Sequence, residues 1–203
     1  MSMLVLASSS PRRIEMLRAA AVPHAVWPVD IDETPRGGES GEALVARLAQ
    51  EKADAAAARA PAGSPVLGAD TMVVAGGALL GKPPHEGAAR QMLALLSGAT
   101  HFVVTGYHLR YFAADGGELR RVIRIVRTDV AVRPIRAAEV DGYLRSQEWR
   151  GKAGAYAIQG RFSCFITGVS GSYENVVGMP LCQVIDDLHA AGLLPKEWPT
   201  WQA

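Results

Sequence analysis

The residues of this chain that could do chemistry begin with the stretch LASSSPRR, in which a serine-rich turn follows an apolar run. Ser10 followed by Pro11 is typical of a helix start, with proline at the first helical position. Arg12 and Arg13 then fall in the first turn, where the helix dipole disfavours each cation by about 0.3–1 kcal/mol. The hydroxyl of Ser8, free backbone amides and two guanidinium groups would together suit phosphate oxygens. The alternative is a solvated arginine pair on an exposed turn.

Further along, charged residues interrupt apolar patterns. Lys52 lies four residues after Leu48 on the apolar stripe of a helix expected at about 42–59, so its ammonium either reaches solvent past the core edge or points into a site. Asp70 interrupts PVLGADTMVV, which predicts a largely buried strand, and a carboxylate there needs a hydrogen-bond, cationic or metal partner. Alternatively, the Asp70 carboxylate has only a structural role and accepts hydrogen bonds from nearby backbone amides. Lys82 follows a Gly-Gly hairpin. It is either a lysine in a solvated turn or a cation that the hairpin brings back toward the end of the strand that carries Asp70.

Three carboxylates, those of Asp30, Asp32 and Glu33, end the segment VPHAVWPVDIDET, which is predicted as a second strand. They could supply oxygen ligands for Mg²⁺, which usually takes one or two protein carboxylates together with phosphate. An acidic loop is the commoner explanation. The histidines show no HxxxH or HExxH spacing, and Cys164 and Cys182 have no CxxC partner, so neither a zinc site nor a disulfide framework is expected.

The composition is that of an ordinary globular chain. It has 203 residues, 49% of them hydrophobic and 20% charged, with a net charge of +1. We expect one domain over residues 1–203, which could be built as two lobes, and no bulk affinity for nucleic acid. No apolar stretch approaches 18 residues and no secretory signal is recognised, so we expect a cytoplasmic protein without membrane association.

Periodicity predicts helices and strands mixed along the whole chain, and hence an α/β fold with a mixed sheet and flanking helices. Helices are expected after Pro11 and over about 42–59, 86–96, 137–146 and 181–191. Strands are expected at 3–7, in 22–34, on both sides of the Gly-Gly hairpin within 66–83, and at 101–112 and 120–135, the last two joined by the turn AADGGE. The segments GKAGAYAIQG and GVSGSYENVVGMP are glycine-rich, which is typical of loops that approach a ligand.

Several of these segments, in this order, resemble the Maf family of nucleoside triphosphate pyrophosphatases. They are LASSSPRRIEMLRAAAV, DIDET, EK at 51–52, GADTMV, GKP at 81–83, SGATHFVVTG, GKAGAYAIQG and GSYENVVGMPL. The resemblance extends from about Leu4 to Leu181. It implies a mixed α/β fold with two lobes around a deep cleft, similar to the inosine triphosphatase-like architecture. It also implies hydrolysis of a nucleoside triphosphate between the α and β phosphates.

The resemblance assigns roles to particular residues. The family's functional residues fall on Ser8, Arg12, Arg13, Glu33, Lys52, Asp70 and Lys82. On this basis we expect Asp70 to act as the general base, Asp70 and Glu33 to hold Mg²⁺ or Mn²⁺, and Ser8, Arg12, Arg13, Lys52 and Lys82 to bind the substrate. A homodimer is also plausible by resemblance.

Within the family, the arginine pair after Ser10-Pro11 and the IQG loop are similar to the dTTP/UTP pyrophosphatase branch. The specificity positions then fall on Arg12, Thr71 and Gln159, and the amide of Gln159 can both donate to and accept from a uracil or thymine edge. Gly151, before Lys152, departs from the Asp that many members carry. Two alternatives stay open: a 7-methyl-GTP or broad-specificity pyrophosphatase, and a nucleotide-sensing protein linked to cell division.

Overall fold

The computed structural model describes residues 3–112 and 119–199. Within it the strands form a hydrogen-bonded sheet in the order β2 (His24–Val26), β1 (Leu4–Leu6), β3 (Val66–Ala75), β5 (Thr100–Phe112), β6 (Leu119–Val132) and β7 (Ile166–Ser170), with β4 (Ala78–Leu80) beside β3. β1 pairs in parallel with β2 and β3, whereas β4 and β7 pair antiparallel with β3 and β6. The predicted α/β class with a mixed sheet and flanking helices is therefore confirmed. The predicted turn AADGGE, at 113–118, lies outside the described residues.

The chain divides into two compact units, and three strands contribute residues to both. The first unit comprises Met1–Asp70, Thr105–Ile125 and Gly178–Ala203, and the second comprises Thr71–Val104 and Val126–Val177. The three shared strands are β3 (Val66–Ala75), β5 (Thr100–Phe112) and β6 (Leu119–Val132).

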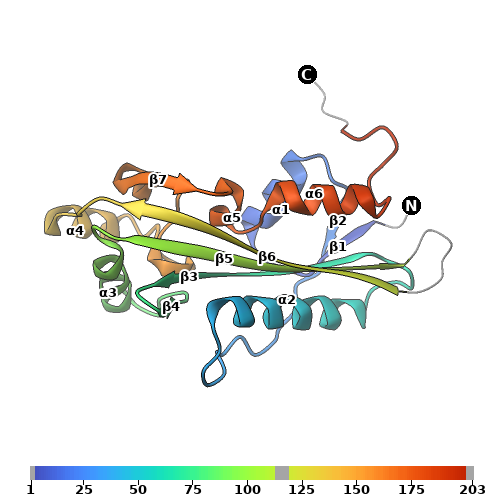
Figure 1. The fold of residues 1–203 in the computed structure, drawn as a ribbon, viewed down its shortest axis with the longest axis horizontal. Helices are drawn as coiled ribbons and strands as arrows, with labels where there is room; N and C mark the ends of the chain where they lie inside the picture. Colours follow the sequence, from blue (N-terminus) through green and yellow to red (C-terminus); the bar gives the residue numbers. More distant parts are fainter. Residues whose placement is uncertain (1–2, 113–118, 200–203) are drawn as a thin grey trace. The chain divides into compact units, whose positions relative to one another are not determined.

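The first unit places helices on both faces of its strands (Figure 1). Its own elements are β1 (Leu4–Leu6), α1 (Pro11–Ala19), β2 (His24–Val26), α2 (Gly41–Ala57) and α6 (Leu181–Ala190). α2 lies along one face, and α1 and α6 lie on the other. Asp187 of α6 joins that helix to the strands, because its carboxylate accepts from the Tyr107 hydroxyl at 2.5 Å and from the Arg124 guanidinium at 2.6 and 2.8 Å.

α2 approaches the strands closely because glycines face its backbone. A Cβ on Gly68 would collide with the carbonyl oxygen of Ala49 and lie 2.7 Å from the amide nitrogen of Ala53. A Cβ on Gly106 would lie 2.5 Å from the carbonyl oxygen of Val45. Small residues on the helix and glycine on the strands thus let the two backbones meet, which places the buried face of α2 against β3 and β5 of this unit.

This close approach makes Gly68→Ala a test of the packing. We expect the unfolding free energy of the variant to fall by about 1–3 kcal/mol, because the added methyl group meets helix backbone that cannot rotate away. Gly37→Ala is the matched control, because a Cβ there meets no atom within 4 Å and the variant should unfold like the wild type. Urea unfolding followed by circular dichroism measures both. Equal midpoints for the two variants would contradict this account of the packing.

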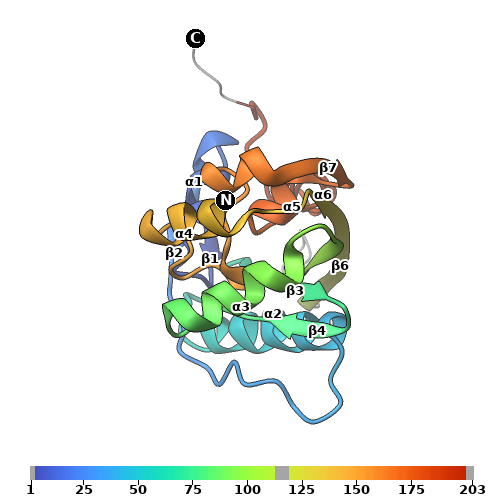
Figure 2. The same cartoon turned by 90° about the vertical axis from the view of Figure 1, so that its left-hand side faces the viewer.

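The second unit contains the remaining helices and strands. They are β4 (Ala78–Leu80), α3 (Glu86–Leu96), α4 (Ala137–Arg145), η1 (Ala153–Ala155), η2 (Arg161–Phe165), β7 (Ile166–Ser170) and α5 (Tyr173–Val177). α3 packs against α4, which Figure 2 also labels, and against η1. A cluster of aromatic rings, Tyr143, Tyr156, Phe162 and Phe165, forms edge-on and tilted contacts within this unit.

The sequence-based expectations fail in two places. The second strand ends at Val26, so the carboxylates at 30–33 lie in a long irregular segment; Pro28, which lacks an amide proton, follows immediately. The glycine-rich stretch at 168–180, expected to be irregular, contains the end of β7 and the whole of α5. α5 is held by Asn175, whose amide donates to the carbonyl oxygens of Val103 and Val126 and to the Thr128 hydroxyl, each at 3.1 Å. These are tertiary contacts that local composition does not reveal.

Two buried histidines give the stability of the protein a pH dependence. Burial lowers the pKa of His101 to about 4, against the weaker opposing effect of Asp129, and burial also lowers the pKa of His108. An unfolded histidine has a pKa of about 6.5. Between these values the unfolded chain binds more protons than the native state, so the unfolding free energy falls as the pH drops.

We therefore expect the unfolding free energy to decrease from pH 6.5 toward pH 4, by up to about 1.4 kcal/mol per pH unit for each histidine. Urea titrations at pH 7, 5.5 and 4.5 measure the slope. His101→Gln should flatten the slope in this window. A slope identical to that of the wild type would show that His101 does not cause the acid sensitivity.

None of the helices within residues 3–112 and 119–199 has the length and apolar character needed to cross a membrane.

Candidate active site

The segment between β1 and α1 is shaped by Ser8, Ser10 and Pro11. Ser10 occupies the N-cap position with extended backbone, and Pro11 is at the start of the helix, as predicted. The Ser10 side chain makes no capping hydrogen bond, however. Its backbone amide donates instead to the Ser8 hydroxyl at 3.2 Å, so the segment folds back on a buried serine at the end of the strand.

Arg13 points into the protein from the first turn of α1 and is 7% exposed. Its Nε donates to the carbonyl oxygen of Gly178 at 2.8 Å, and its Nη1 donates to the carbonyl oxygen of Ala69 at 2.7 Å and to the Ser8 hydroxyl at 3.3 Å. Burial lowers the pKa of Arg13, and the negative charge of Asp70 opposes that shift. These bonds explain why an arginine is found in the first turn of a helix, where the helix dipole disfavours a cation. Arg13 links α1 to Ala69, the residue that precedes Asp70.

Arg12 is the half-buried neighbour of Arg13. Burial lowers the pKa of Arg12 as well, which reflects the cost of removing a guanidinium from water. Arg12 also adds positive charge beside Arg13, where it lowers the pKa of that residue further. The start of α1 therefore carries two guanidinium groups, one buried and bonded to backbone carbonyls and one at the edge of the protein interior.

Lys52 forms the centre of the charge arrangement in the first unit. Its Nζ lies 2.6 Å from Oδ1 of Asp70 and 2.6 Å from Oε1 of Glu33. The side chains of Lys52 and Asp70 are 9% and 11% exposed, whereas that of Glu33 is 46% exposed. The lysine that falls on the apolar stripe of α2 thus reaches the carboxylate that interrupts β3 and also a more exposed carboxylate of the segment between β2 and α2.

Of the three neighbouring carboxylates, only Glu33 is described in contact with Lys52. Asp32 is exposed, and hydrogen bonds from Thr34 lower its pKa, first from the Thr34 side chain and then from the Thr34 backbone amide, which donates to Oδ1 at 2.9 Å. Asp30 is exposed too. Within the described ranges there is no group of three or more His, Cys, Asp or Glu side chains placed to hold a metal ion. The carboxylates that meet are therefore a pair, Glu33 and Asp70, joined by one ammonium.

Three predicted residues belong to the second unit. Thr71 follows Asp70 along β3, and Lys82 is exposed just after β4. Gln159 is exposed in a turn closed by a hydrogen bond from the Gly160 amide to the Ala157 carbonyl oxygen at 3.1 Å. The residue before Lys82, Gly81, accepts from the amide of Gly154 at 3.1 Å, so the two segments that carry Lys82 and Gln159 are hydrogen-bonded within this unit.

Two acceptors of Arg13 were missed by sequence reasoning. They are backbone carbonyls at Ala69 and Gly178, and any residue type at those positions would present the same oxygen. The only signal in the sequence was the unfavourable position of a cation in the first turn, which indicates that Arg13 needs acceptors without saying where they are.

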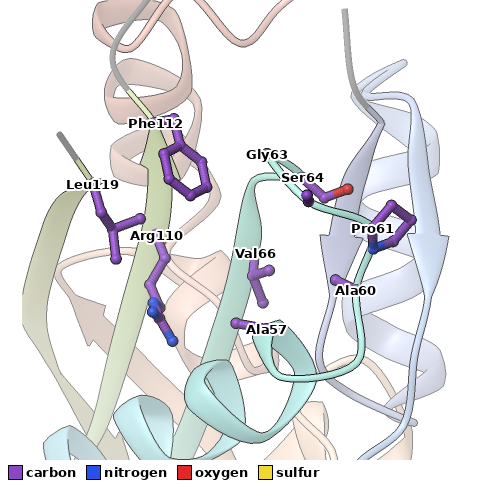
Figure 3. Close-up of a pocket in the computed structure, with 10 residues that line it drawn as sticks. Ala57, Ala60, Pro61, Gly63, Ser64, Val66, Arg110, Phe112 and Leu119 are labelled. Carbon is purple, nitrogen blue, oxygen red and sulfur yellow. The ribbon is translucent and has the colours of Figure 1, made fainter. Parts of the chain in front are cut away.

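A separate pocket lies at the end of α2 in the first unit (Figure 3). Small and apolar residues line most of it, among them Ala57, Pro61, Val66 and Phe112. Arg110, which also lines it, donates to Asp54 of α2 at 2.7 Å. None of the predicted site residues lines this pocket, so it is distinct from the Lys52 arrangement.

The fold and the first unit define a mixed α/β protein in which a buried ammonium joins two carboxylates. Arg13, in the first turn of α1, bonds Ser8 and the backbone carbonyl of the residue before one of those carboxylates. The chain belongs to the Maf-like protein family, whose model matches residues 3–191. The predicted family is therefore confirmed.

Comparison with curated proteins gives relatives that cover nearly the whole chain. It is 44% identical over 193 residues to a dTTP/UTP pyrophosphatase of Geobacter metallireducens, with 95% of this chain and 98% of that protein aligned. It is 47% identical over 197 residues to a protein of the same name from Myxococcus xanthus, covering 97% and 96%. A third, from Caulobacter vibrioides, is 47% identical over 193 residues, covering 95% and 97%.

Among solved structures, the Ham1 protein of Staphylococcus aureus matches 63% of this chain and 71% of its own, with 17% identity and a TM-score of 0.40. At that level the likeness carries no argument about fold or function.

Proposed function

We propose that this protein is a nucleoside triphosphate pyrophosphatase that hydrolyses dTTP and UTP to the monophosphate and pyrophosphate. The substrate assignment is supported by the names of relatives that are 44–47% identical over nearly their whole length. The structural observation that carries the proposal is the buried Lys52 ammonium, 2.6 Å from both Asp70 and Glu33. A carboxylate and a cation held together in a protein interior, near a cationic helix start, suit attack on a polyanionic substrate.

In the proposed reaction Asp70 is the general base. It takes a proton from water whose oxygen forms a bond to the α phosphorus, while the bond from that phosphorus to the bridging oxygen breaks and pyrophosphate leaves with the electron pair. Lys52 supplies a fixed positive charge beside the base. Because Asp70 is only 8% exposed, its carboxylate is held in one place by the strand and by Lys52 and reorganises little during the reaction.

We assign phosphate binding to Ser8, Arg12, Arg13, Lys52 and Lys82. Arg13 uses Nε and Nη1 for protein acceptors, so we assign it a mainly electrostatic part, supplying charge from its buried position. Arg12, at the edge of the interior, is the guanidinium better placed to bond an incoming phosphate directly. Arg12, Thr71 and Gln159 are the residues to which we assign selection of the base.

We also propose dependence on Mg²⁺ or Mn²⁺. Two observations support this proposal: oxygens of Glu33 and Asp70 each lie 2.6 Å from the Lys52 ammonium, so the two carboxylates are near each other, and Mg²⁺ commonly takes one or two protein carboxylates with phosphates and water. The ion would be held by these two residues together with substrate phosphates. When bound it would neutralise charge developing on the phosphates.

Pyrophosphate release across dTTP, UTP, CTP, dATP, GTP and 7-methyl-GTP tests the proposal, with Mg²⁺, Mn²⁺ or EDTA present. We expect preference for dTTP and UTP, monophosphate as the co-product, and loss of activity in EDTA. Preference for 7-methyl-GTP would assign the chain to the 7-methyl-GTP pyrophosphatases, and lack of any preference would make it a broad-specificity pyrophosphatase. Binding of nucleotide without any pyrophosphate release would replace the proposal with a sensor.

A further inference from the structure

The segment between β2 and α2 carries Glu33, yet it contains no helix or strand from Trp27 to Ser40. Such a long irregular connection needs side-chain anchors, because it lacks a backbone ladder to hold its shape. The side chain of Glu33 itself is 46% exposed, and its Oε1 lies 2.6 Å from the Lys52 ammonium. The position of its carboxylate therefore depends on how the backbone beside it is held.

Arg47, five residues before Lys52 on α2, is the main anchor of this segment. Its Nε and Nη2 donate to the two carboxylate oxygens of Glu39 at 2.7 and 2.8 Å, which is a bidentate pair. Nη2 also donates to the backbone carbonyl of Thr34 at 3.1 Å, and Nη1 donates to Glu51 at 3.2 Å. The side chains of Arg47 and Glu39 are only 13% and 9% exposed.

Glu39 is held from two directions. Besides Arg47, it accepts the backbone amide of Arg36 at 3.0 Å. These hydrogen bonds, that with Arg47 first, lower the pKa of Glu39 to about 2. Glu39 therefore stays ionised, and its pair with Arg47 stays charged, at any pH at which the protein is assayed.

The carbonyl that Arg47 holds belongs to the residue next to Glu33. The same helix thus binds the segment at adjacent points: Arg47 holds the backbone at Thr34, and Lys52 binds the side chain of Glu33. We infer that Arg47 is a positioning residue that keeps Glu33 beside Lys52 and Asp70 by clamping the backbone at Thr34 and Glu39. This inference rests on the proposed function, since it assigns Arg47 a part in the same site.

The alternative is that Arg47 only stabilises the start of α2, since Glu39 lies just before the N-cap Ser40. The two roles differ in one measurable respect. A positioning role acts through Glu33, so it disappears when Glu33 no longer contributes. A purely stabilising role does not depend on Glu33 at all.

The test compares Arg47→Ala with Arg110→Ala. Arg110 is a matched control, because it is 18% exposed and bonds a carboxylate of the same helix, Asp54, at 2.7 Å. We expect kcat for dTTP hydrolysis to fall about 10- to 100-fold in Arg47→Ala, as for loss of other orienting contacts. It should stay near the wild-type value in Arg110→Ala.

The decisive comparison repeats Arg47→Ala in a Glu33→Gln background. There we expect no further loss of kcat, since the residue that Arg47 positions is already disabled. Arg47→Lys keeps the charge but cannot bond both Glu39 oxygens and the Thr34 carbonyl in the same planar geometry, so we expect it to retain the fold and lose part of the activity. The inference would be overturned if the fold-loss of kcat in the double variant equalled the product of the losses in Arg47→Ala and Glu33→Gln. Wild-type kcat in Arg47→Ala would also overturn it.

Hydrogen exchange provides a readout that needs no turnover. In the nucleotide-free protein, the amides of residues 30–34 should exchange faster in Arg47→Ala and Arg47→Lys than in the wild type or Arg110→Ala. Unchanged exchange at these amides would also overturn the inference. If the wild type releases no pyrophosphate from any nucleotide, the proposed function fails, and the exchange data alone then decide whether Arg47 holds this segment.

Discussion

Asp70→Asn is expected to bind nucleotide almost as the wild type does and to lose about 10²- to 10⁴-fold in kcat, the usual contribution of a general base. Asparagine has nearly the shape of aspartate, and its amide oxygen can still accept from the Lys52 ammonium, which lies 2.6 Å from Oδ1 in the native protein. The carboxyl group that would take the proton is lost. Steady-state pyrophosphate release gives kcat, and equilibrium titration with dTTP gives the affinity.

The control for this variant is Asp54→Asn. Asp54 is also an aspartate of the first unit paired with a cation, Arg110, but its side chain is 45% exposed and it does not contact Lys52 in the described structure. We expect its kcat and affinity to match the wild type. Full turnover in Asp70→Asn would remove Asp70 from the role of base, whereas a parallel loss of binding would indicate that it mainly holds substrate or metal.

Lys52→Met is expected to damage both activity and stability. The methionine replaces the lysine side chain at similar length, which leaves the buried Asp70 carboxylate without the ammonium that lies 2.6 Å from it. Breaking a buried ion pair by removing one partner typically costs about 3–5 kcal/mol, because the remaining charge is left uncompensated. Turnover should also fall strongly, because Lys52 sits between the proposed base and Glu33. Urea unfolding and pyrophosphate release measure the two effects.

Two further variants separate the causes. In Lys52→Met with Asp70→Asn, neither charge remains, so we expect much of the lost stability to return while activity stays absent. Arg18→Met is the control for a surface pair, since Arg18 and Glu15 are 68% and 65% exposed and such pairs contribute about 0–1 kcal/mol. If Lys52→Met unfolded like Arg18→Met, the pair with Asp70 would not be a stabilising feature of the interior.

The family, the class of fold and most element boundaries could be predicted from the sequence, because they depend on local patterns. The helix at 42–59 is found as α2, Gly41–Ala57, since its apolar stripe repeats at helical spacing. The end of β2 at Val26 was not predicted, because a run of three carboxylates after apolar residues is compatible both with a strand that continues and with one that has ended. β7 and α5 were missed because pairing with β6 and the contacts of Asn175 hold them.

For the site, the sequence by itself determined which side chains were out of place. Lys52 lies on an apolar stripe, Asp70 interrupts an apolar strand, and Arg13 lies in a helix turn that disfavours cations. Each is unfavourable locally, and a local pattern can reveal that cost.

Only the tertiary structure decided how those costs are offset. It brings Lys52 to Asp70 and to Glu33 instead of Asp32, gives Arg13 the carbonyl oxygens of Ala69 and Gly178, and makes Arg47 the anchor of the β2–α2 segment. The physical reason is that these partners are remote in sequence or are backbone oxygens. A backbone oxygen is the same at every residue, so its use by a particular arginine leaves no trace in the sequence.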